Sequence, residues 1–265
     1  MGVPPSVDAL VAAARTVHAW FNASPDERAA GAAAGAPAGG TGPRGGDGPE
    51  PPPGPAVPLP RHDADPPTAP LADVLHARRA RYDFTGATLD ARDLGALLHL
   101  ALGPGRRVTA PDGSVRDLGP APSAGGLPSL DAYVVLHRAA APVPAGVHRY
   151  ARGEHALVPV RVGDPVAGLR ATYLQPEFAT RPAASVLLVG RLDRTLPRYG
   201  LRHYTTLHVD AGIALQNLWL VATALGLAGC AVSGIRSDPA SALLALPAHG
   251  VPLVAFAVGP GAATA

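Results

Sequence analysis

Residues 209–225 read VDAGIALQNLWLVATAL, a run in which apolar side chains occur on nearly every side of a helix. The run is too long for a typical strand, and Gly226 follows it as a residue that commonly ends helices. A helix that is apolar all round is normally buried. The sequence therefore predicts a long buried helix over 209–225 at the centre of the fold.

Short apolar runs before and after this helix predict a sheet. Residues 184–189 (ASVLLV) form a continuous apolar run typical of a strand covered on both faces, and residues 131–137 (DAYVVLH) are a second strand candidate. Residues 228–232 and 253–258 supply two more. Because helical patterns separate these runs, the sequence predicts a layered α+β or α/β body.

Two further helices are predicted ahead of the sheet. Residues 71–79 indicate a short helix. Asp90 can cap the exposed amides at the start of the second, and Asp93 favours the positive end of its dipole. Its apolar face consists of Leu94, Leu97, Leu98 and Ala101. The glycines and proline at 103–105 end it.

The first 70 residues differ in composition from the rest. Gly and Pro number 31 each among 265 residues, and much of this excess lies before residue 70. Apolar residues recur at helical spacing early on, so residues 1–22 are expected to form a short helix that docks on the body or on a partner. Residues 23–70 carry almost no large apolar side chain and are expected to be a disordered linker. The body is expected to span 71–265.

Charge and cysteine content exclude several classes of protein. The 22 basic and 20 acidic residues are scattered, so nucleic acid is not an expected partner. Cys230 is the one cysteine, and its apolar neighbours predict a buried, inert thiol. The start of the chain lacks the basic segment of a signal peptide, and no run is long enough for a membrane span. We therefore expect a cytoplasmic protein.

Common catalytic signatures are missing from the chain. It has no glycine-rich dinucleotide or P-loop motif, no HExxH, no GxSxG and no paired cysteines. His203 and His208 are five residues apart, so they do not stack on one helix face as two metal ligands four apart would. No metal site is predicted.

A cluster of three arginines is the first segment with a suggestive chemistry. Arg78, Arg79 and Arg81 place three guanidinium groups within four residues, at the end of a predicted short helix. Guanidinium forks suit phosphate. A solvated run of charges is the alternative.

Two other segments have their own suggestive chemistry. Residues 122–126 (PSAGG) have side chains too small to shield the backbone, so a flat ligand could approach closely, although a plain turn is equally compatible. Arg198 and Tyr199 set a cation beside a phenol a few residues before the long helix. Because arginine does not release its proton, any proton transfer there would fall to Tyr199.

These segments occur in the order and approximate spacing of the nitroreductase-like flavoprotein family, and they most resemble its SagB-type peptide dehydrogenases. The resemblance covers about residues 71–260. Its pieces are RRARYDFTG at 78–86, PSAGGL at 122–127, GVHRY at 146–150, RYGLRHY at 198–204 and DAGIALQNLWLVATALGL at 210–227. The resemblance implies an α+β fold with a central, mostly antiparallel sheet flanked by helices. It also implies an FMN-dependent homodimer with the long helix in the dimer core.

The same resemblance assigns roles around a flavin held between subunits. Arg78 and Arg79 would contact its phosphate and ribityl region, residues 122–126 would line it, and Ser233 and Gly234 would bring backbone donors near its reactive edge. The cofactor-binding residues implied in this way are Arg78, Arg79, Ala80, Tyr82, Pro122, Ser123, Ala124, Gly125, Gly126, Ser233 and Gly234.

This chain departs from the family at the phosphate end. Ala80 stands where a serine is usual and Tyr82 where a second basic residue is usual, and residues 258–260 lack a basic residue often found near them. At roughly 1.5 to 3 kcal/mol for each charge-assisted contact, two losses would weaken flavin binding by about two orders of magnitude or more. Arg81 is the neighbouring residue that could compensate.

The resemblance also implies the chemistry. In azoline oxidation a base removes a ring proton as hydride passes to the flavin, and a Lys-Tyr pair does this in the family. Here Arg198 occupies the lysine position and Tyr199 keeps the tyrosine. Tyr199 would therefore be the catalytic base, with Arg198 as the cation that stabilises its phenolate.

Three functions remain in competition at this point. The first is an FMN-dependent dehydrogenase that oxidises azolines to thiazoles or oxazoles in a precursor peptide, acting with a cyclodehydratase. The second is another flavin reaction on the same scaffold, such as nitro or quinone reduction or cyclic-dipeptide oxidation. The third is a scaffold subunit that has lost tight flavin binding, which Ala80, Tyr82 and Arg198 suggest.

Overall fold

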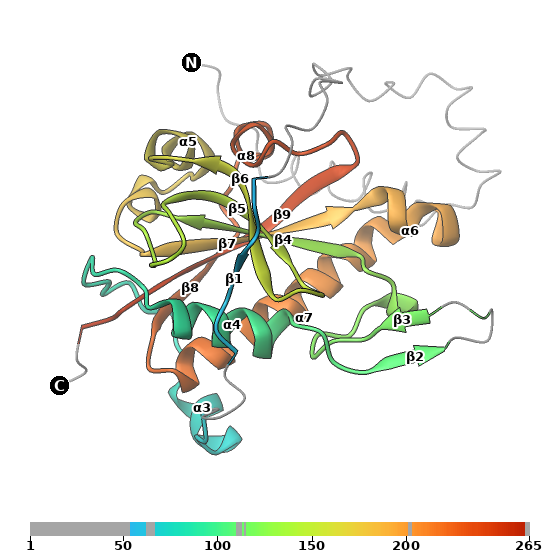
Figure 1. Ribbon diagram of the computed structural model, residues 1–265, viewed down its shortest axis with the longest axis horizontal. Coiled ribbons are helices and arrows are strands. Elements are labelled where there is room, and N and C mark those ends of the chain that lie inside the picture. Colours follow the sequence, from blue (N-terminus) through green and yellow to red (C-terminus); the bar gives the residue numbers. More distant parts are fainter. Residues whose placement is uncertain (1–53, 62–66, 110–112, 114, 201–202, 263–265) are drawn as a thin grey trace, which may run out of the picture.

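The computed structural model describes residues 54–61, 67–109, 113, 115–200 and 203–262 (Figure 1). The predicted N-terminal helix and most of the predicted linker lie outside the described residues. The described part of the predicted linker corrects the expected start of the body, because β1 (Val57–Pro58) pairs with β6 (Ala156–Val162) and Leu59 is buried. A proline is tolerated on such an edge strand, and the prolines hid it in the sequence. The body therefore begins before residue 71.

Seven strands form the central sheet, in the order β1-β6-β5-β4-β7-β9-β8. The remaining strands are β4 (Leu130–Leu136), β5 (Gly146–Ala151), β7 (Ala184–Arg191), β8 (Ala228–Val232) and β9 (Gly250–Gly259). Every neighbouring pair in the sheet is antiparallel. This confirms the predicted sheet, in which the four expected strands are β4, β7, β8 and β9. A separate hairpin consists of β2 (Arg107–Thr109) and β3 (Val115–Asp117).

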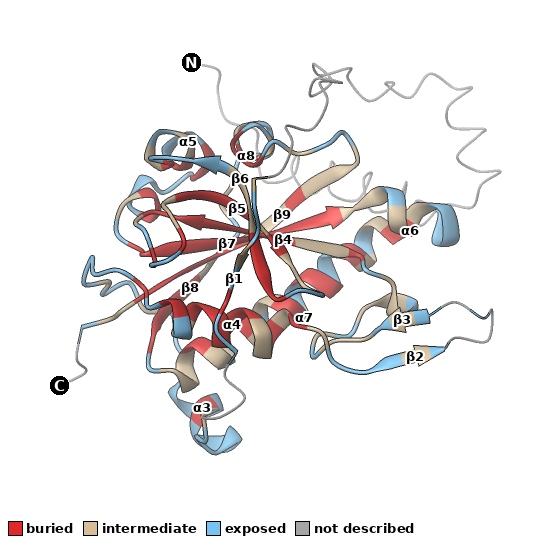
Figure 2. Ribbon diagram, viewed as in Figure 1, coloured by how far each residue is buried: buried red, intermediate tan, exposed pale blue. Residues whose placement is uncertain are grey.

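Helices cover both faces of the sheet (Figures 1 and 2). One face packs against α4 (Ala91–Leu102) and α7 (His203–Ala224), and the other against α5 (Val166–Thr172), η2 (Pro176–Ala179) and α8 (Ser237–Leu244). The central strand β7 serves both layers because its side chains alternate. Val186 and Leu188 join one cluster, whereas Leu187 and Val189 join the other. The fold is therefore a three-layer α+β arrangement, as predicted.

The two helices that carry most of the first layer follow their sequence signals. Asp90 caps α4 by accepting a hydrogen bond from the Arg92 amide at 2.7 Å, as expected. Helix α7 begins at His203, six residues before the predicted start. Its inner side is buried, but the outer side of a single chain is open, with Val209 59% exposed and Gln216 exposed as well. A single chain therefore does not bury α7 on all sides.

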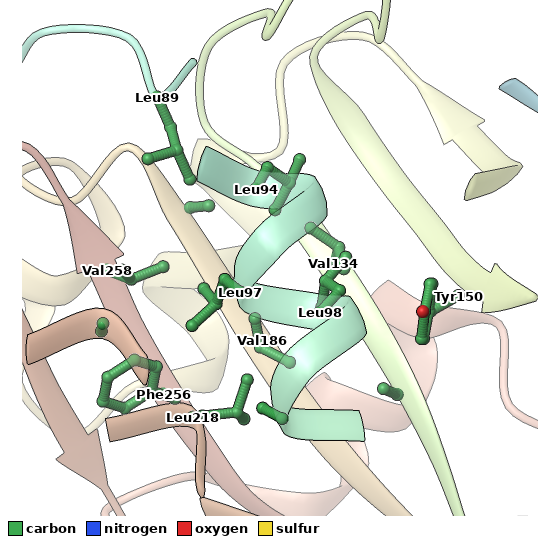
Figure 3. Packing of buried hydrophobic residues seen from close by; sticks show 14 of the residues in the cluster. Leu89, Leu94, Leu97, Leu98, Val134, Tyr150, Val186, Leu218, Phe256 and Val258 are labelled. Atoms are coloured by element: carbon green, nitrogen blue, oxygen red, sulfur yellow. The ribbon is translucent and has the colours of Figure 1, made fainter. Parts of the chain in front are cut away.

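Leu218 is fully buried in the cluster between α7, α4 and the sheet (Figure 3). We expect Leu218→Ala to lower the free energy of unfolding by about 2–5 kcal/mol, because it removes apolar contacts and leaves a cavity. Urea unfolding followed by circular dichroism measures the change. Val115→Ala, at an exposed position on β3, is the matched control and should change stability by less than about 0.5 kcal/mol. Equal losses for both variants would contradict the assigned core.

The single cysteine behaves as expected. Cys230 is buried on β8, and its thiol donates to the Ala231 carbonyl at 3.2 Å. Burial raises the pKa of the Cys230 thiol, which disfavours the reactive thiolate. Among the helices of the described residues, none combines the length and the apolar character needed to cross a membrane.

Candidate functional site

The arginine cluster follows α3 (Leu71–Ala77) and lies against the C-terminal half of α7. The Arg78 guanidinium lies over the Trp219 ring, with its carbon 4.6 Å from the ring centroid. The Trp219 indole N–H donates to the Arg79 carbonyl at 3.2 Å. Between these segments lies a cavity of about 140 Å³, lined by Arg79, Arg81, Trp219 and Thr223 among others. Two guanidinium groups at one small cavity suit an anion such as phosphate, whereas the Thr223 hydroxyl already donates to the Trp219 carbonyl at 2.8 Å.

Arg81 is already engaged in this arrangement. Its guanidinium donates to the Asp83 carboxylate at 2.6 Å and to the Ala262 carbonyl at 2.6 Å. The hydrogen bond from Arg81 holds the pKa of Asp83 below its usual value. Arg81 therefore joins this segment to the C-terminal end of the chain, and a bound anion would have to share it with Asp83. Among the described residues, the side chain of the exposed Arg79 makes a long 3.4 Å hydrogen bond to the Ala77 carbonyl, which a bound anion could replace.

The small-residue loop 122–126 lies just ahead of β4 and contains the short turn η1 (Ala124–Gly126). Gly125 and Gly126 have φ angles of 62° and 66°, a left-handed conformation that favours glycine. The Ser123 hydroxyl donates to the Leu127 carbonyl at 2.6 Å. Arg116 of β3 donates to the Gly125 carbonyl, so the hairpin braces the loop. The residues of this loop are exposed or half-buried, as a ligand-lining segment requires.

Tyr199 lies directly on this loop. It is the last residue of α6 (Leu192–Tyr199), and its hydroxyl oxygen occupies the place where a side chain on Gly125 would begin. Its ring stacks on that of His203, with the centroids 4.9 Å apart. The Arg198 guanidinium carbon is 5.7 Å from the Tyr199 ring centroid. The structure thus brings Arg198, Tyr199 and the loop into one cluster.

Ser233 and Gly234 occupy a different place from the loop and Tyr199. They follow β8, and the Gly234 carbonyl accepts from the Leu174 amide at 2.9 Å. Leu174 is also the side chain closest to Gly234. The Ser233 carbonyl accepts from the Ile235 amide of its own segment at 2.9 Å. Ala80 and Tyr82 are exposed beside the arginine cluster, and the Tyr82 ring lies 6.0 Å from that of Phe178.

The arginine cluster and the Tyr199 cluster lie at opposite ends of α7. In Figure 1, α3 lies beside one end of this helix and α6 beside the other. His203 and Trp219 mark these ends, about 24 Å apart at 1.5 Å of rise per residue. The described residues of one chain therefore hold the arginine cluster and the Tyr199 cluster far apart.

A larger cavity of about 530 Å³ lies behind the loop, where Pro122 and Ser123 contribute to its wall. Its charged lining residues are Asp131, Arg149, Arg152, Glu154, Arg194 and Asp210. Their formal charges balance, and Asp131 already accepts from Arg191 at 2.5 Å and from Arg194 at 2.9 Å. The charged residues of this cavity therefore indicate no preference for an anionic or a cationic ligand. Sequence reasoning missed it because its walls come from segments far apart in the chain.

The comparisons with known proteins agree with this architecture. A model of the nitroreductase family matches residues 75–260. The chain belongs to the nitroreductase family. A candidate nitroreductase of Methanocaldococcus jannaschii is 29% identical over 191 residues, which are 71% of this chain and 90% of the relative.

Solved structures share the nitroreductase fold. A candidate nitroreductase of Ralstonia eutropha aligns with a TM-score of 0.64 and 21% identity, over 86% of this chain and 99% of its own. One from Anabaena variabilis aligns with a TM-score of 0.62 and 24% identity, over 72% of this chain but only 38% of its own. A chain of the E. coli microcin synthetase McbBCD complex, solved with truncated pro-MccB17 bound, aligns with a TM-score of 0.59 and 24% identity, over 70% of each chain.

Membership of the nitroreductase family implies a flavin, and the residues present fit one. The cavity at Arg79 and Arg81 offers guanidinium donors of the kind that bind phosphate. The loop around Gly125 exposes backbone without large side chains in the way. No group of three or more His, Cys, Asp or Glu side chains within the described part of the chain could hold a metal ion.

Proposed function

We propose that this member of the nitroreductase family is an FMN-dependent dehydrogenase that oxidises azolines to thiazoles or oxazoles in a ribosomally synthesised peptide. The contact between Tyr199 and Gly125 carries the proposal, since it sets a phenol against a loop suited to a planar cofactor. The fold shared with a chain of the microcin synthetase complex, whose structure holds truncated pro-MccB17, supports a peptide substrate.

Each group of residues has a role in this proposal. Arg78 and Arg79 hold the flavin phosphate, the loop 122–126 lines the ring system, and Ser233 and Gly234 provide backbone donors from β8. When bound, FMN supplies a two-electron hydride acceptor. The Tyr199 oxygen accepts the proton that leaves the azoline ring. Tyr199 has to be a phenolate before it takes this proton, and it becomes a neutral phenol afterwards; Arg198, beside its ring, stabilises the phenolate.

The separation of the arginine cluster from the Tyr199 cluster along α7 leads us to propose a homodimer. A two-fold axis across α7 would bring the arginine end of one copy beside the loop end of the other. The outer side of α7 carries apolar residues that the chain leaves exposed, as Val209 is, or half-buried, as Ile213 and Leu220 are. Leu71 and Leu75 of α3 are also exposed. A second copy of the chain covers this surface and completes the site, because a symmetric interface uses the same face of both copies. The proposed partners are this second copy, a precursor peptide and a cyclodehydratase, in the cytoplasm.

Purified protein and a synthetic azoline-containing peptide test the proposed function. We expect a yellow protein, or a colourless one that turns yellow with added FMN, and peptide that loses two hydrogen atoms by mass spectrometry. Turnover of a nitroaromatic or quinone with NAD(P)H, but not of the peptide, would favour the second function, to which the relative from M. jannaschii points. Protein that takes up no FMN would favour a scaffold subunit.

Arg79→Ala is expected to weaken FMN binding by about 10- to 150-fold. The variant removes one charge-assisted contact, worth roughly 1.5 to 3 kcal/mol, while Arg81 remains shared with Asp83. Quenching of FMN fluorescence on titration of the apoprotein measures the affinity. Arg92→Ala, at an exposed arginine on α4, is the control and should leave it unchanged. Equal affinity for Arg79→Ala and wild type would remove Arg79 from the phosphate site.

A further inference from the structure

The ring of Tyr199 is packed against His203 of α7. The two ring centroids are 4.9 Å apart and the ring planes are inclined by 21°. His203 is 3% exposed, and its amide donates to the Gly200 carbonyl at 3.1 Å. Burial lowers the pKa of His203, against an opposing effect of Asp210, so the ring is neutral near pH 7. His203 therefore offers Tyr199 a fixed, flat and uncharged surface.

The Nε2 nitrogen of His203 does not explain the position of this residue. Its Nε2 is buried and has no hydrogen-bond partner among the described residues. A buried polar atom without a partner costs stability, so a phenylalanine would fill this space at least as well for packing alone. The contact with Tyr199 is made by the face of the ring, which phenylalanine shares.

Gly125 constrains the position of Tyr199 as well, at the hydroxyl end of its ring. A Cβ at this position would lie 3.2 Å from the Tyr199 Cζ and would overlap the hydroxyl oxygen. The φ angle of 62° independently disfavours a side chain there. Gly125 thus leaves the space that the Tyr199 hydroxyl fills.

Hydrogen bonds connect the two segments that contain His203 and Gly125. Asp210, two turns beyond His203 on α7, accepts from the Ser129 hydroxyl at 2.7 Å. The Ser129 amide in turn donates to the Leu127 carbonyl at the end of the loop. The loop that contains Gly125 and the helix that contains His203 are therefore tied together on either side of Tyr199.

We propose that His203 and Gly125 are positioning residues that set the orientation of the Tyr199 phenol over the loop. The inference rests on the proposed role of Tyr199 as the base, and it extends that role to two residues with no chemistry of their own. A phenol displaced by about 1 Å loses rate without losing substrate, since a shift of that size can cost about 10²-fold.

Two substitutions at position 203 distinguish a role of the ring face from a role of the ring nitrogens. In the FMN-loaded protein, His203→Ala is expected to lower kcat for azoline oxidation by about 10- to 100-fold, with KM and flavin content unchanged. His203→Phe should stay within about threefold of wild type, because it keeps the stacked surface. Equal losses for both variants would overturn the proposal, since the nitrogen and not the ring face would then matter.

A spectroscopic readout makes the test independent of turnover. In protein labelled with 3-fluorotyrosine, the ¹⁹F resonance of Tyr199 is assigned by its loss in Tyr199→Phe. His203→Ala should shift this resonance because the ring current of the stacked imidazole is gone, and His203→Phe should leave it close to its original position. An unmoved resonance in His203→Ala would overturn the proposal even if the wild-type protein had no azoline activity.

The glycine provides a second pair of variants should His203→Ala fold poorly. Gly125→Ala introduces the overlapping Cβ, whereas Gly86→Ala has a similar backbone strain at φ 79° with no atom within 4 Å. We expect kcat to fall and the Tyr199 resonance to shift in Gly125→Ala only. A normal kcat in Gly125→Ala and His203→Ala, with Tyr199→Phe inactive, would reject the positioning role and leave the proposed function intact. Activity in Tyr199→Phe would reject the proposed base instead.

Discussion

Tyr199→Phe is expected to lower azoline oxidation by about 10²- to 10⁴-fold, the range that a positioned general base contributes. The substitution removes the oxygen that would accept the ring proton and keeps the aromatic ring that stacks on His203. Flavin content should be unchanged, because the substitution removes one hydroxyl group and leaves the proposed phosphate contacts of Arg78 and Arg79 in place. Single-turnover kinetics with an azoline peptide, together with the flavin absorbance of the purified variant, measure both quantities.

Tyr204→Phe is the matched control for this substitution. Tyr204 follows His203 on α7, and its ring contacts that of His208, with the centroids 5.0 Å apart. The control should keep wild-type kcat. If Tyr199→Phe were as active as Tyr204→Phe, Tyr199 would not be the base. If both were inactive, the loss could not be assigned to the proton transfer.

Much of the central sheet and of the first layer could be predicted from sequence, because the signals there are local. The continuous apolar run of β7 reflects its burial on both faces, and the cap of α4 depends on Asp90 alone. The strand β6 was missed because Pro159 interrupts it and its neighbour β5 has a bulge after Val147. The start of α7 was missed because residues 203–208 carry polar and β-branched side chains that hide the helical pattern.

The candidate site was predictable in its parts and not in its assembly. The sequence and its resemblance singled out Tyr199 and Gly125 separately, but no local pattern shows that two residues 74 positions apart touch. His203 was considered in the sequence as a metal ligand and set aside, and no local pattern indicates that its ring stacks on Tyr199. The engagement of Arg81 with Asp83 and Ala262 likewise depends on where the C-terminal end of the chain lies. Such facts are tertiary, and only the folded chain supplies them.

Val209→Asp is expected to convert the protein to a monomer and to remove its flavin together with its activity. Val209 is an exposed apolar residue on the outer side of α7, the surface that a second copy would cover. In a symmetric dimer the substitution buries an unpaired carboxylate in each copy, which costs several kcal/mol. A cost of about 3 kcal/mol raises the dissociation constant of the dimer by more than 100-fold. Light scattering after size exclusion measures the mass, and absorbance of the same peak measures the flavin.

Val162→Asp gives the comparison that assigns the effect to the interface. Val162 ends β6 with 61% of its surface exposed, close to the 59% of Val209. Strand β6 lies next to the β1 edge of the sheet, whereas α7 packs on β7, β9 and β8 towards the other edge. The same change of charge there should leave mass, flavin and activity as in wild type. A monomeric Val209→Asp that still binds FMN and turns over would show that one chain forms the complete site. In that case the separation of Arg79 from Tyr199 along α7 would need another explanation, and the proposed dimer would be rejected.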